Sequence, residues 1–284
     1  MIKVAVLGYG NIGSGVVQVL MKNKETIAKK AGDEIVPACV LDLRDFPGDV
    51  MVVKDINLIT QNPEISIVVE TMGGTKPAYA FVKACLEAGK HVATSNKELV
   101  AAHGPELLEI AKAHHVSFLF EASVGGGIPI IRPLVSSITS DAVTEITGIL
   151  NGTTNYMLTK MSEDGLDYDA VLEDAQERGY AERNPAADVE GHDARRKIAI
   201  LSSLAFGKYV DYEDVYTEGI TKITSADFAY AKVLGSRIKL FGTSKKKEDG
   251  SISAMVCPVM ITNEHPLFAV NDVMNAILVR GESM

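Results

Sequence analysis

The chain has 284 residues, which is long for one domain and sufficient for two. Its hydrophobic content of 46% and charged content of 23% are typical of a globular protein. A formal net charge of −9 argues against a general nucleic-acid binder, and the basic run KKK at 245–247 stands in a segment that resembles an exposed turn.

The cysteines and the N-terminal residues indicate in which cellular compartment the protein is expected. Cys39, Cys85 and Cys257 lie far apart and form no C-x-x-C pair, as expected for reduced intracellular thiols. The opening MIKVAVLGYG enters a strand directly and leaves no room for a signal peptide, and no apolar run approaches membrane-spanning length. We therefore expect a cytoplasmic protein with no membrane partner.

The first 130 residues alternate between short β-rich runs and helical patterns. Apolar runs predict strands at 2–8, 34–42, 65–74, 90–96 and 116–122. Helical spacing predicts helices at 11–30, 77–88 and 98–113. Strands that alternate with helices are typical of βαβ units, so residues 1–130 are predicted to form an α/β dinucleotide-binding domain of the Rossmann type.

The rhythm changes after GGGIP at 125–129. Longer helices are expected at 154–163, 168–178, 193–206 and 226–234. Strand-like segments at 143–150, 238–242 and 252–261 alternate as in a sheet with one packed face. Residues 131–284 are therefore predicted to form a second, α+β domain with a mainly antiparallel or mixed sheet.

A glycine-rich turn joins the first predicted strand to the first predicted helix. GYGNIGSG places Gly8, Gly10 and Gly13 in the spacing that a dinucleotide requires, with Asn11 and Ile12 between them. One glycine makes the tight turn, one admits the pyrophosphate, and one lets the helix pack on the strand. The turn predicts a bound NAD or NADP, with its phosphates at the helix N-terminus.

The residue that reads the adenosine ribose should follow the second strand, within LDLRD. Asp42 would accept from a free ribose hydroxyl and favours NAD, whereas Arg44 could serve the 2′-phosphate of NADP. We lean to NAD and leave both open. Thr71 and Ser95, near the ends of two further predicted strands, complete the expected cofactor site.

Lys197 raises a question in DVEGHDARRKIAILSSLAFG. It shares one helical stripe with Asp193, Ile200, Leu201 and Leu204, and an unpaired ammonium is costly to bury. Asp193, one turn earlier, can hold it, and such a lysine can pass a proton to and from a substrate oxygen. A buried structural ion pair fits the spacing equally well. The preceding carboxylates, among them Glu182 and Asp188, could bind a substrate ammonium.

Two further segments could contact a ligand. Lys97 in TSNKELV follows a strand, at the sheet edge where open α/β sheets bind ligands, although a surface lysine at a helix start is the alternative. NGTTNY at 151–156 could present Asn151, Gly152 and Thr153 to a carboxylate, or could simply cap a helix.

Taken together, these segments resemble the homoserine dehydrogenase family over essentially the whole chain. The matching words are GYGNIGSGV, SNKELVA, EASVGGGIPI, GILNGTTNYML, GYAERNPAADVEGHDARRKIAILS and HPLFAVNDVMNAILV. The resemblance implies NAD(P)-dependent interconversion of aspartate-4-semialdehyde and homoserine, on the route to threonine, methionine and isoleucine.

The resemblance also implies roles for individual residues. Lys197 would be the acid/base lysine beside Asp193, Glu182 and Asp188 would bind the amino end of the substrate, and Lys97 would be a second proton carrier. It further implies a Na⁺ or K⁺ site made of the backbone carbonyls of Glu121, Val124, Gly126 and Ile128. Finally, it implies a homodimer formed through the sheet of the second domain.

Three features depart from the family pattern. The chain stops at VRGESM, where the family continues with a Gly-rich segment and a helix that return to the first domain. The alternative function is therefore a truncated nucleotide-binding protein without turnover. There is no C-terminal regulatory domain, so threonine feedback through such a module is not expected. Arg183 beside Glu182 alters the charge next to the predicted ammonium site.

Overall fold

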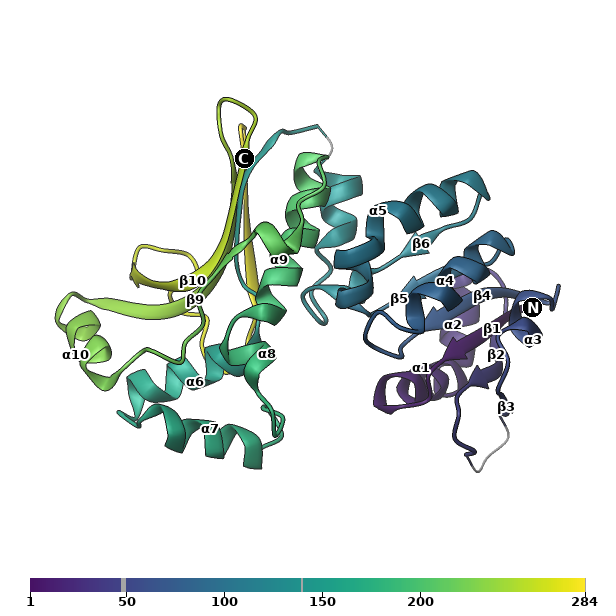
Figure 1. The fold of residues 1–284 in the computed structure, drawn as a ribbon, viewed down its shortest axis with the longest axis horizontal. Coiled ribbons are helices and arrows are strands. Elements are labelled where there is room, and N and C mark those ends of the chain that lie inside the picture. The colour runs from purple at the N-terminus through teal and green to yellow at the C-terminus, as the bar shows by residue number, and fades with distance from the viewer. Residues whose placement is uncertain (47–49, 139, 284) are drawn as a thin grey trace. The chain divides into compact units, whose positions relative to one another are not determined.

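The computed structural model describes residues 1–46, 50–138 and 140–283, which form two compact units (Figure 1). The first unit is Met1–Ser123 and the second is Val124–Met284. The division falls a few residues before the boundary near 130 that the sequence suggested.

The first unit contains a six-stranded sheet in the order β3-β2-β1-β4-β5-β6. All of its strand pairs are parallel. The strands are β1 (Ile2–Leu7), β2 (Ile35–Leu41), β3 (Met51–Val53), β4 (Ile65–Glu70), β5 (His91–Thr94) and β6 (Phe118–Leu119). This topology confirms the predicted Rossmann-type domain, because the apolar central strand β1 lies between two neighbours and is buried from Val4 to Leu7.

The helices of this unit pack on its sheet as the apolar spacing requires. They are α1 (Asn11–Lys22), α2 (Lys24–Ala31), α3 (Asn57–Thr60), α4 (Ala78–Glu87) and α5 (Lys97–Ala113), followed by the 3₁₀ turn η1 (Glu121–Ser123). Helix α1 contacts β1 and β2, and α4 contacts β4 and β5. Val17 of α1 meets Val6 and Val40 of the sheet in one buried cluster.

Some elements of this unit differ from the prediction. The helix expected at 11–30 is two helices divided at Asn23, a residue that competes with helical backbone hydrogen bonds. The strand expected at 65–74 ends at Glu70, because Gly73 and Gly74 turn the chain with positive φ angles. The strand expected at 116–122 is only Phe118–Leu119, and β3 and α3 were not predicted.

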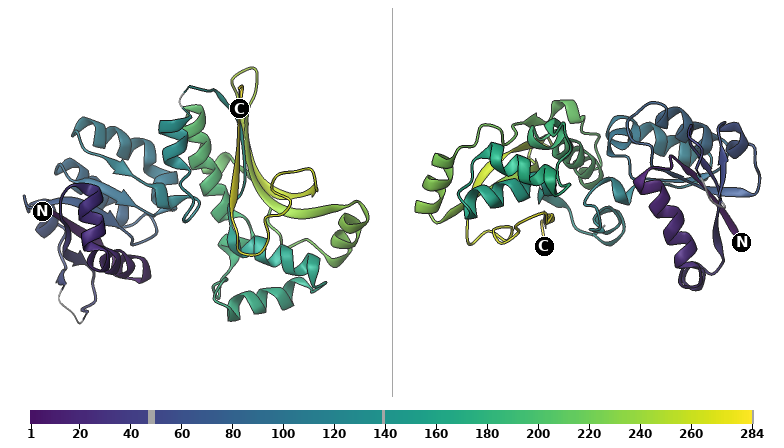
Figure 2. Two further views of the ribbon diagram at one scale, coloured as in Figure 1. Left: turned by 180° about the vertical axis from the view of Figure 1, so that it is seen from behind. Right: turned by 90° about the horizontal axis from the view of Figure 1, so that it is seen from below.

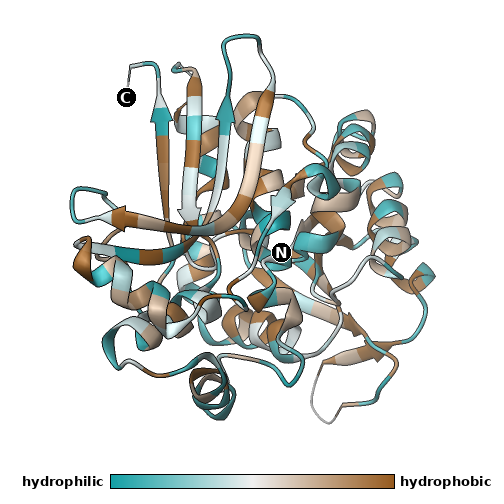
Figure 3. Ribbon diagram, turned by 60° about the vertical axis from the view of Figure 1, so that its left-hand side comes forward, coloured by the Kyte–Doolittle hydropathy of each residue, from teal (hydrophilic) through white to brown (hydrophobic). Residues whose placement is uncertain are grey.

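The second unit contains a five-stranded sheet in the order β11-β7-β9-β10-β8. Its pairs are antiparallel except for the parallel pair of β8 with β10. The strands are β7 (Val143–Ile149), β8 (Tyr216–Thr217), β9 (Ser236–Lys246), β10 (Ile252–Thr262) and β11 (Ala276–Gly281). The mixed, mainly antiparallel sheet confirms the prediction, and hydropathy alternates along its strands (Figure 3).

Of the helices described in the second unit, the four longest begin within two residues of their predicted positions, and the three short ones were not predicted. They are the π-helical turn η2 (Pro133–Ser137), α6 (Gly152–Glu163), α7 (Tyr168–Glu177), α8 (Ala186–Val189), α9 (His192–Phe206), the 3₁₀ turn η3 (Tyr212–Asp214) and α10 (Ser225–Val233). Helix α9 packs on β9 and β10 and lies beside the sheet from both viewpoints (Figures 1 and 2). In the part of the chain described, no helix combines the length and apolar character needed to cross a membrane.

Strand β11 is the main element of this unit that was not predicted. It pairs with β7, and Ala276 lies opposite Ile149. The connection from β10 to β11 covers part of the core, where Leu267 packs with Ile149, Phe241 and Ile261. Asn151 therefore follows a strand, β7, that is paired on both sides with strands distant in sequence, β9 and β11.

A lysine is buried in the second unit. Lys239 of β9 is 2% exposed, and its Nζ donates to three neutral oxygens, Asn155 Oδ1, Val270 O and Asn271 Oδ1. Burial, together with the charge of Arg237, lowers the pKa of Lys239 from 10.5 to about 8, although Glu163 and Asp272 oppose the shift. Folding therefore favours loss of this proton.

This shift predicts a pH-dependent contribution to stability. A lysine whose pKa is lower in the folded state stabilises that state fully above pH 10.5 and loses the contribution as pH falls toward 8. Between pH 8 and 10.5, the unfolding free energy of the wild type should rise relative to that of Lys239→Met by up to about 3 kcal/mol. Urea denaturation followed by circular dichroism measures it, with the exposed Lys222→Met as control. A difference that stays constant with pH would contradict the assignment.

Candidate functional site

The glycine turn of the first unit is shaped by close contacts at two of its glycines. Gly8 has a φ of +90°, and an added Cβ there would lie 2.9 Å from Met72 Cγ. At Gly13, an added Cβ would lie 1.9 Å from Gly8 O, so α1 can approach the turn only without a side chain. Gly10, by contrast, has open space on its Cβ side. The turn is thus tight inside and open outside, as a pyrophosphate at the start of α1 requires.

Thr71 holds this turn from the end of β4, and Glu70 beside it joins the ends of β4 and β5. Thr71 Oγ1 donates to Leu7 O and Gly8 O, at 3.1 and 3.0 Å. Glu70 is fully buried and accepts from the amide of Met72 at 2.7 Å and the hydroxyl of Thr94 at 2.5 Å. Its carbonyl accepts from the amide of Ser95 at 3.4 Å. Glu70 was not predicted, because a lone carboxylate in an apolar strand has no local pattern.

The two residues expected to read the ribose are paired with each other. Arg44 Nε and Nη2 donate to Oδ1 and Oδ2 of Asp42 at 3.1 and 3.0 Å, and the amide of Tyr9 donates to Asp42 Oδ2 at 2.9 Å. The Arg44 guanidinium holds the pKa of the Asp42 carboxyl well below its usual range. The Asp42 side chain is 9% exposed, whereas that of Arg44 is 64% exposed and lies over the Phe46 ring. The carboxylate is thus fixed, and the guanidinium is at the surface.

Lys97 is the first residue of α5, one residue after Asn96. Asn96 caps the helix, because its Oδ1 accepts from the amide of Leu99 at 3.0 Å. Its Nδ2 donates to Gly74 O at 2.7 Å and ties the cap to the turn after β4. Lys97 is therefore held, half-buried, at the carboxyl end of β5, where the sequence placed it.

Lys197 of the second unit is held by two partners. Its side chain is only 14% exposed, and its Nζ lies 2.7 Å from Asp193 Oδ2, one helical turn earlier. The same Nζ donates to Leu150 O at 2.8 Å, at the end of β7. The expected pairing with Asp193 is present, and the buried ammonium has both an opposite charge and a carbonyl acceptor.

Asn151 joins this pair to a second carboxylate. Its Nδ2 donates to Asp188 Oδ1 at 2.7 Å and to Asp193 Oδ2 at 2.9 Å. Its Oδ1 accepts from the amide of Thr154 at 2.9 Å and so caps α6. One buried amide therefore connects the end of β7, the start of α6, the short helix α8 and helix α9. We name Asn151, Asp188, Asp193 and Lys197 the α6–α9 cluster.

The other residues predicted to bind substrate are arranged differently. Gly152 lies against the β10–β11 connection, where an added Cβ would be 2.8 Å from Val273 O. Thr153 Oγ1 donates to Tyr180 O at 2.6 Å. Glu182 and Arg183 are exposed, and the carbonyl of Glu182 accepts from Gln176 Nε2 at 3.0 Å. Only Asp188 of the two expected ammonium ligands is hydrogen-bonded within the α6–α9 cluster.

The segment expected to bind a monovalent cation is divided between the units. Glu121 begins η1 at the end of the first unit, and Val124, Gly126 and Ile128 open the second. In the second unit, Gly125 and Gly126 have φ angles of +78° and +57°, and the amide of Ile128 donates to Gly125 O at 2.9 Å. The geometry of this turn does not by itself test for a bound ion, so the ion site stays a prediction.

Two family models match the chain. One, described as homoserine dehydrogenase, covers residues 129–284 and includes the α6–α9 cluster. The other, described as the NAD-binding domain of homoserine dehydrogenase, covers residues 8–121. The chain belongs to the homoserine dehydrogenase family. Its first unit is accordingly an NAD(P)-binding domain.

Individual members of the family resemble the chain over its whole length. It is 44% identical to a homoserine dehydrogenase of Mycobacterium tuberculosis over 289 residues, which are 99% of this chain and 65% of the relative. A solved homoserine dehydrogenase of Thiobacillus denitrificans matches with a TM-score of 0.95 at 40% identity, over 100% of this chain and 67% of that one. A hyperthermophilic archaeal homoserine dehydrogenase in complex with NADPH matches with a TM-score of 0.81 at 26% identity, over 100% of this chain and 89% of that one. The chain spans about two thirds of the length of the curated relatives it matches.

The glycine turn generates a matched pair of predictions. Gly10→Ala should leave the unfolding free energy within about 0.5 kcal/mol of wild type, because its Cβ meets open space. It should nevertheless weaken NADH binding, because the methyl group occupies the approach to the pyrophosphate. Gly13→Ala should cost roughly 1–3 kcal/mol, because its Cβ would overlap Gly8 O. Urea denaturation and NADH fluorescence titration measure the two effects. Wild-type NADH affinity in Gly10→Ala would show that the pyrophosphate does not lie against Gly10.

Proposed function

We propose that the chain interconverts aspartate-4-semialdehyde and homoserine with NAD or NADP, in the biosynthesis of threonine, methionine and isoleucine. The observation that carries this proposal is the ammonium of Lys197, largely buried yet 14% exposed, between Asp193 and Leu150 O. An ammonium has three N–H donors, and these two contacts leave one for a substrate oxygen.

Lys197 acts as the proton carrier in this proposal. In the reductive direction it gives a proton to the aldehyde oxygen as hydride reaches the aldehyde carbon, so that CHO becomes CH₂OH and the lysine becomes an amine. In the oxidative direction the amine takes the hydroxyl proton. The bound dinucleotide supplies or accepts the hydride. Asp193 holds the lysine in place throughout.

The amino end of the substrate is bound by carboxylates. Asp188 is half-buried, and its orientation is fixed by the amide of Asn151 at 2.7 Å, so it can receive a substrate ammonium without rearranging. Glu182 supplies a second, exposed carboxylate, with Gly152 and Thr153 at the start of α6. Lys97, at the start of α5, is the second candidate proton carrier.

A steady-state assay with homoserine tests this function. The wild type should produce NAD(P)H, and Lys197→Ala should reduce kcat by about 100-fold or more, because the general acid/base that this proposal assigns to the substrate oxygen is lost. NADH affinity should stay near wild type, because Gly8 to Gly13 lie in the other unit. Lys222→Ala, an exposed lysine, is the control.

The outcomes separate the two functions. Dinucleotide binding without turnover in the wild type would support a nucleotide-binding protein instead. Wild-type activity in Lys197→Ala would overturn the assignment of the proton carrier.

We propose NAD as the preferred dinucleotide. The Asp42 carboxylate is fixed by Tyr9 and can accept from a ribose hydroxyl, whereas a 2′-phosphate would have to draw Arg44 away from it. We expect a higher kcat/KM with NAD than with NADP, and Arg44→Ala should lower the value for NADP more than for NAD. Equal losses with both dinucleotides would show that Arg44 does not read the ribose.

Two further family properties complete the proposal. Na⁺ or K⁺ would be held by the carbonyls of Glu121, Val124, Gly126 and Ile128, since hard oxygen ligands in a glycine turn suit such ions. Activity in KCl or NaCl against choline chloride at equal ionic strength tests the ion, and equal activity would exclude a requirement for it. A homodimer would form through the sheet of the second unit, and sedimentation equilibrium tests it, with a monomer as the contrary outcome.

A further inference from the structure

Lys239 is a buried cation that the proposed chemistry does not use. Its three acceptors, Asn155 Oδ1 at 3.1 Å, Val270 O at 2.5 Å and Asn271 Oδ1 at 2.9 Å, use all three of its N–H donors. All three are neutral, and an ammonium buried among neutral acceptors gains less than one beside a carboxylate. A hydrophobic residue at this position would cost less free energy to bury than an ammonium. The presence of a lysine here therefore needs an explanation other than burial.

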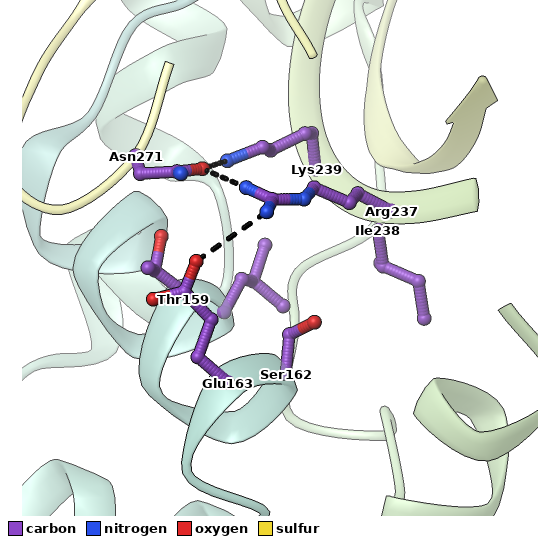
Figure 4. A pocket seen from close by; sticks show the side chains of 8 residues that line it. Thr159, Ser162, Glu163, Arg237, Ile238, Lys239 and Asn271 are labelled. Carbon is purple, nitrogen blue, oxygen red and sulfur yellow. Dashed lines mark hydrogen bonds and ion pairs between the residues drawn. The ribbon is translucent and has the colours of Figure 1, made fainter. Parts of the chain in front are cut away.

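The three acceptors belong to two segments that Lys239 joins. Asn155 lies in the second turn of α6, and Val270 and Asn271 lie in the connection from β10 to β11. Figure 4 shows Lys239 and Arg237 reaching from β9 to the same side chain, Asn271. The ammonium thus fastens a strand, a helix and a connecting segment at one point.

The connection runs along α6 beyond this point. Asn155 Nδ2 donates to Val270 O and Met274 O at 3.2 and 3.0 Å. The amide of Asp272 donates to Thr159 Oγ1 at 3.1 Å, in the next turn of the helix. Residues 270–274 are therefore hydrogen-bonded along two turns of α6, with Lys239 beneath one end.

The same connection reaches the α6–α9 cluster. An added Cβ on Gly152 would lie 2.8 Å from Val273 O, so the connection fits closely against the first residue of α6. The preceding residue is Asn151, whose amide orients Asp188 and Asp193. A displacement of residues 270–274 would therefore shift the start of α6 and, through Asn151, both carboxylates.

We propose that Lys239 is a positioning residue, which fastens residues 270–274 to α6 and thereby sets the placement of Asn151 and the carboxylates that it holds. It acts through these segments and touches no substrate in this assignment. The inference rests on the proposed function where it concerns kinetics, and on the structure alone where it concerns the order of α6.

Arg237 provides a contrast on the same strand. It donates to Asn271 at 2.8 Å, but it is also 3.5 Å from Glu163 and stacks on Phe268, and its side chain is 30% exposed. Its ion pair with α6 is made at Glu163, the last residue of the helix. Losing its charge should therefore leave the first turn of α6 in place.

The experiment compares Lys239→Met, Asn271→Ala and Arg237→Met, with Lys222→Met as the exposed control. Lys239→Met should reduce kcat/KM for homoserine by about 10- to 100-fold, mainly through KM, because the ammonium ligands of the substrate lose their placement. Asn271→Ala should produce a smaller loss of the same kind, and Arg237→Met should stay within about threefold of wild type. The affinity for NADH should not change in any variant.

A second measurement keeps the test independent of activity. Amide hydrogen exchange of residues 152–158 should accelerate in Lys239→Met and not in Arg237→Met. If Lys239→Met loses stability while kcat/KM and exchange of this segment stay at wild-type values, the residue is merely structural and the inference is overturned. If the wild-type chain shows no turnover, the proposed function fails, and the exchange result alone decides the positioning role.

Discussion

The second unit depends on how one lysine side chain is held on the apolar face of a helix. Lys197 lies on the side of α9 that packs on the sheet, and burying its charge without a partner would cost several kcal/mol. Asp193 and the carbonyl of Leu150 remove that cost from two directions, at 2.7 and 2.8 Å. Because Leu150 directly follows β7 and precedes Asn151, the lysine also ties α9 to the turn between β7 and α6.

The largely buried Lys197 and the fully buried Lys239 show why the partner of a lysine matters. Lys197 has a carboxylate one turn away on its own helix, supplied by the sequence spacing itself. Lys239 has amides and a carbonyl supplied by α6 and by the β10–β11 connection, and burial lowers its pKa to about 8. The first arrangement pairs an ammonium with a carboxylate of its own helix. The second uses an ammonium to join β9, α6 and the β10–β11 connection by hydrogen bonds.

Local patterns made the pairing of Lys197 with Asp193, the glycine turn and most helices predictable. The glycine turn is a stretch of eight residues between a strand and a helix, and the ion pair follows from a four-residue spacing within one helix. The parallel sheet followed from alternating strands and helices, and the mixed sheet from two-residue alternation. These features need no information about distant residues.

What was missed depends on partners far along the chain. Strand β11 is a short element that is defined by its pairing with β7, more than 100 residues earlier, and its apolar AILV run is too short to show that partner. Glu70 is the one charged residue of β4, and Lys239 stands between Ile238 and Leu240 in β9, and only the fold shows what these two side chains hold. The role of Asn151 was also incomplete in the sequence. NGTTNY indicated a cap, but the same amide reaches carboxylates 37 and 42 residues later.

This bridging amide explains why two carboxylates can be held around one lysine without forcing each other apart. Asp188 and Asp193 carry like charges, and like charges close together disfavour ionisation unless a donor stands between them. Asn151 donates one N–H to each, and Lys197 neutralises Asp193. The Asn151 amide thereby fixes the direction of both carboxylates. The same amide that caps α6 therefore sets the geometry of the carboxylates around Lys197.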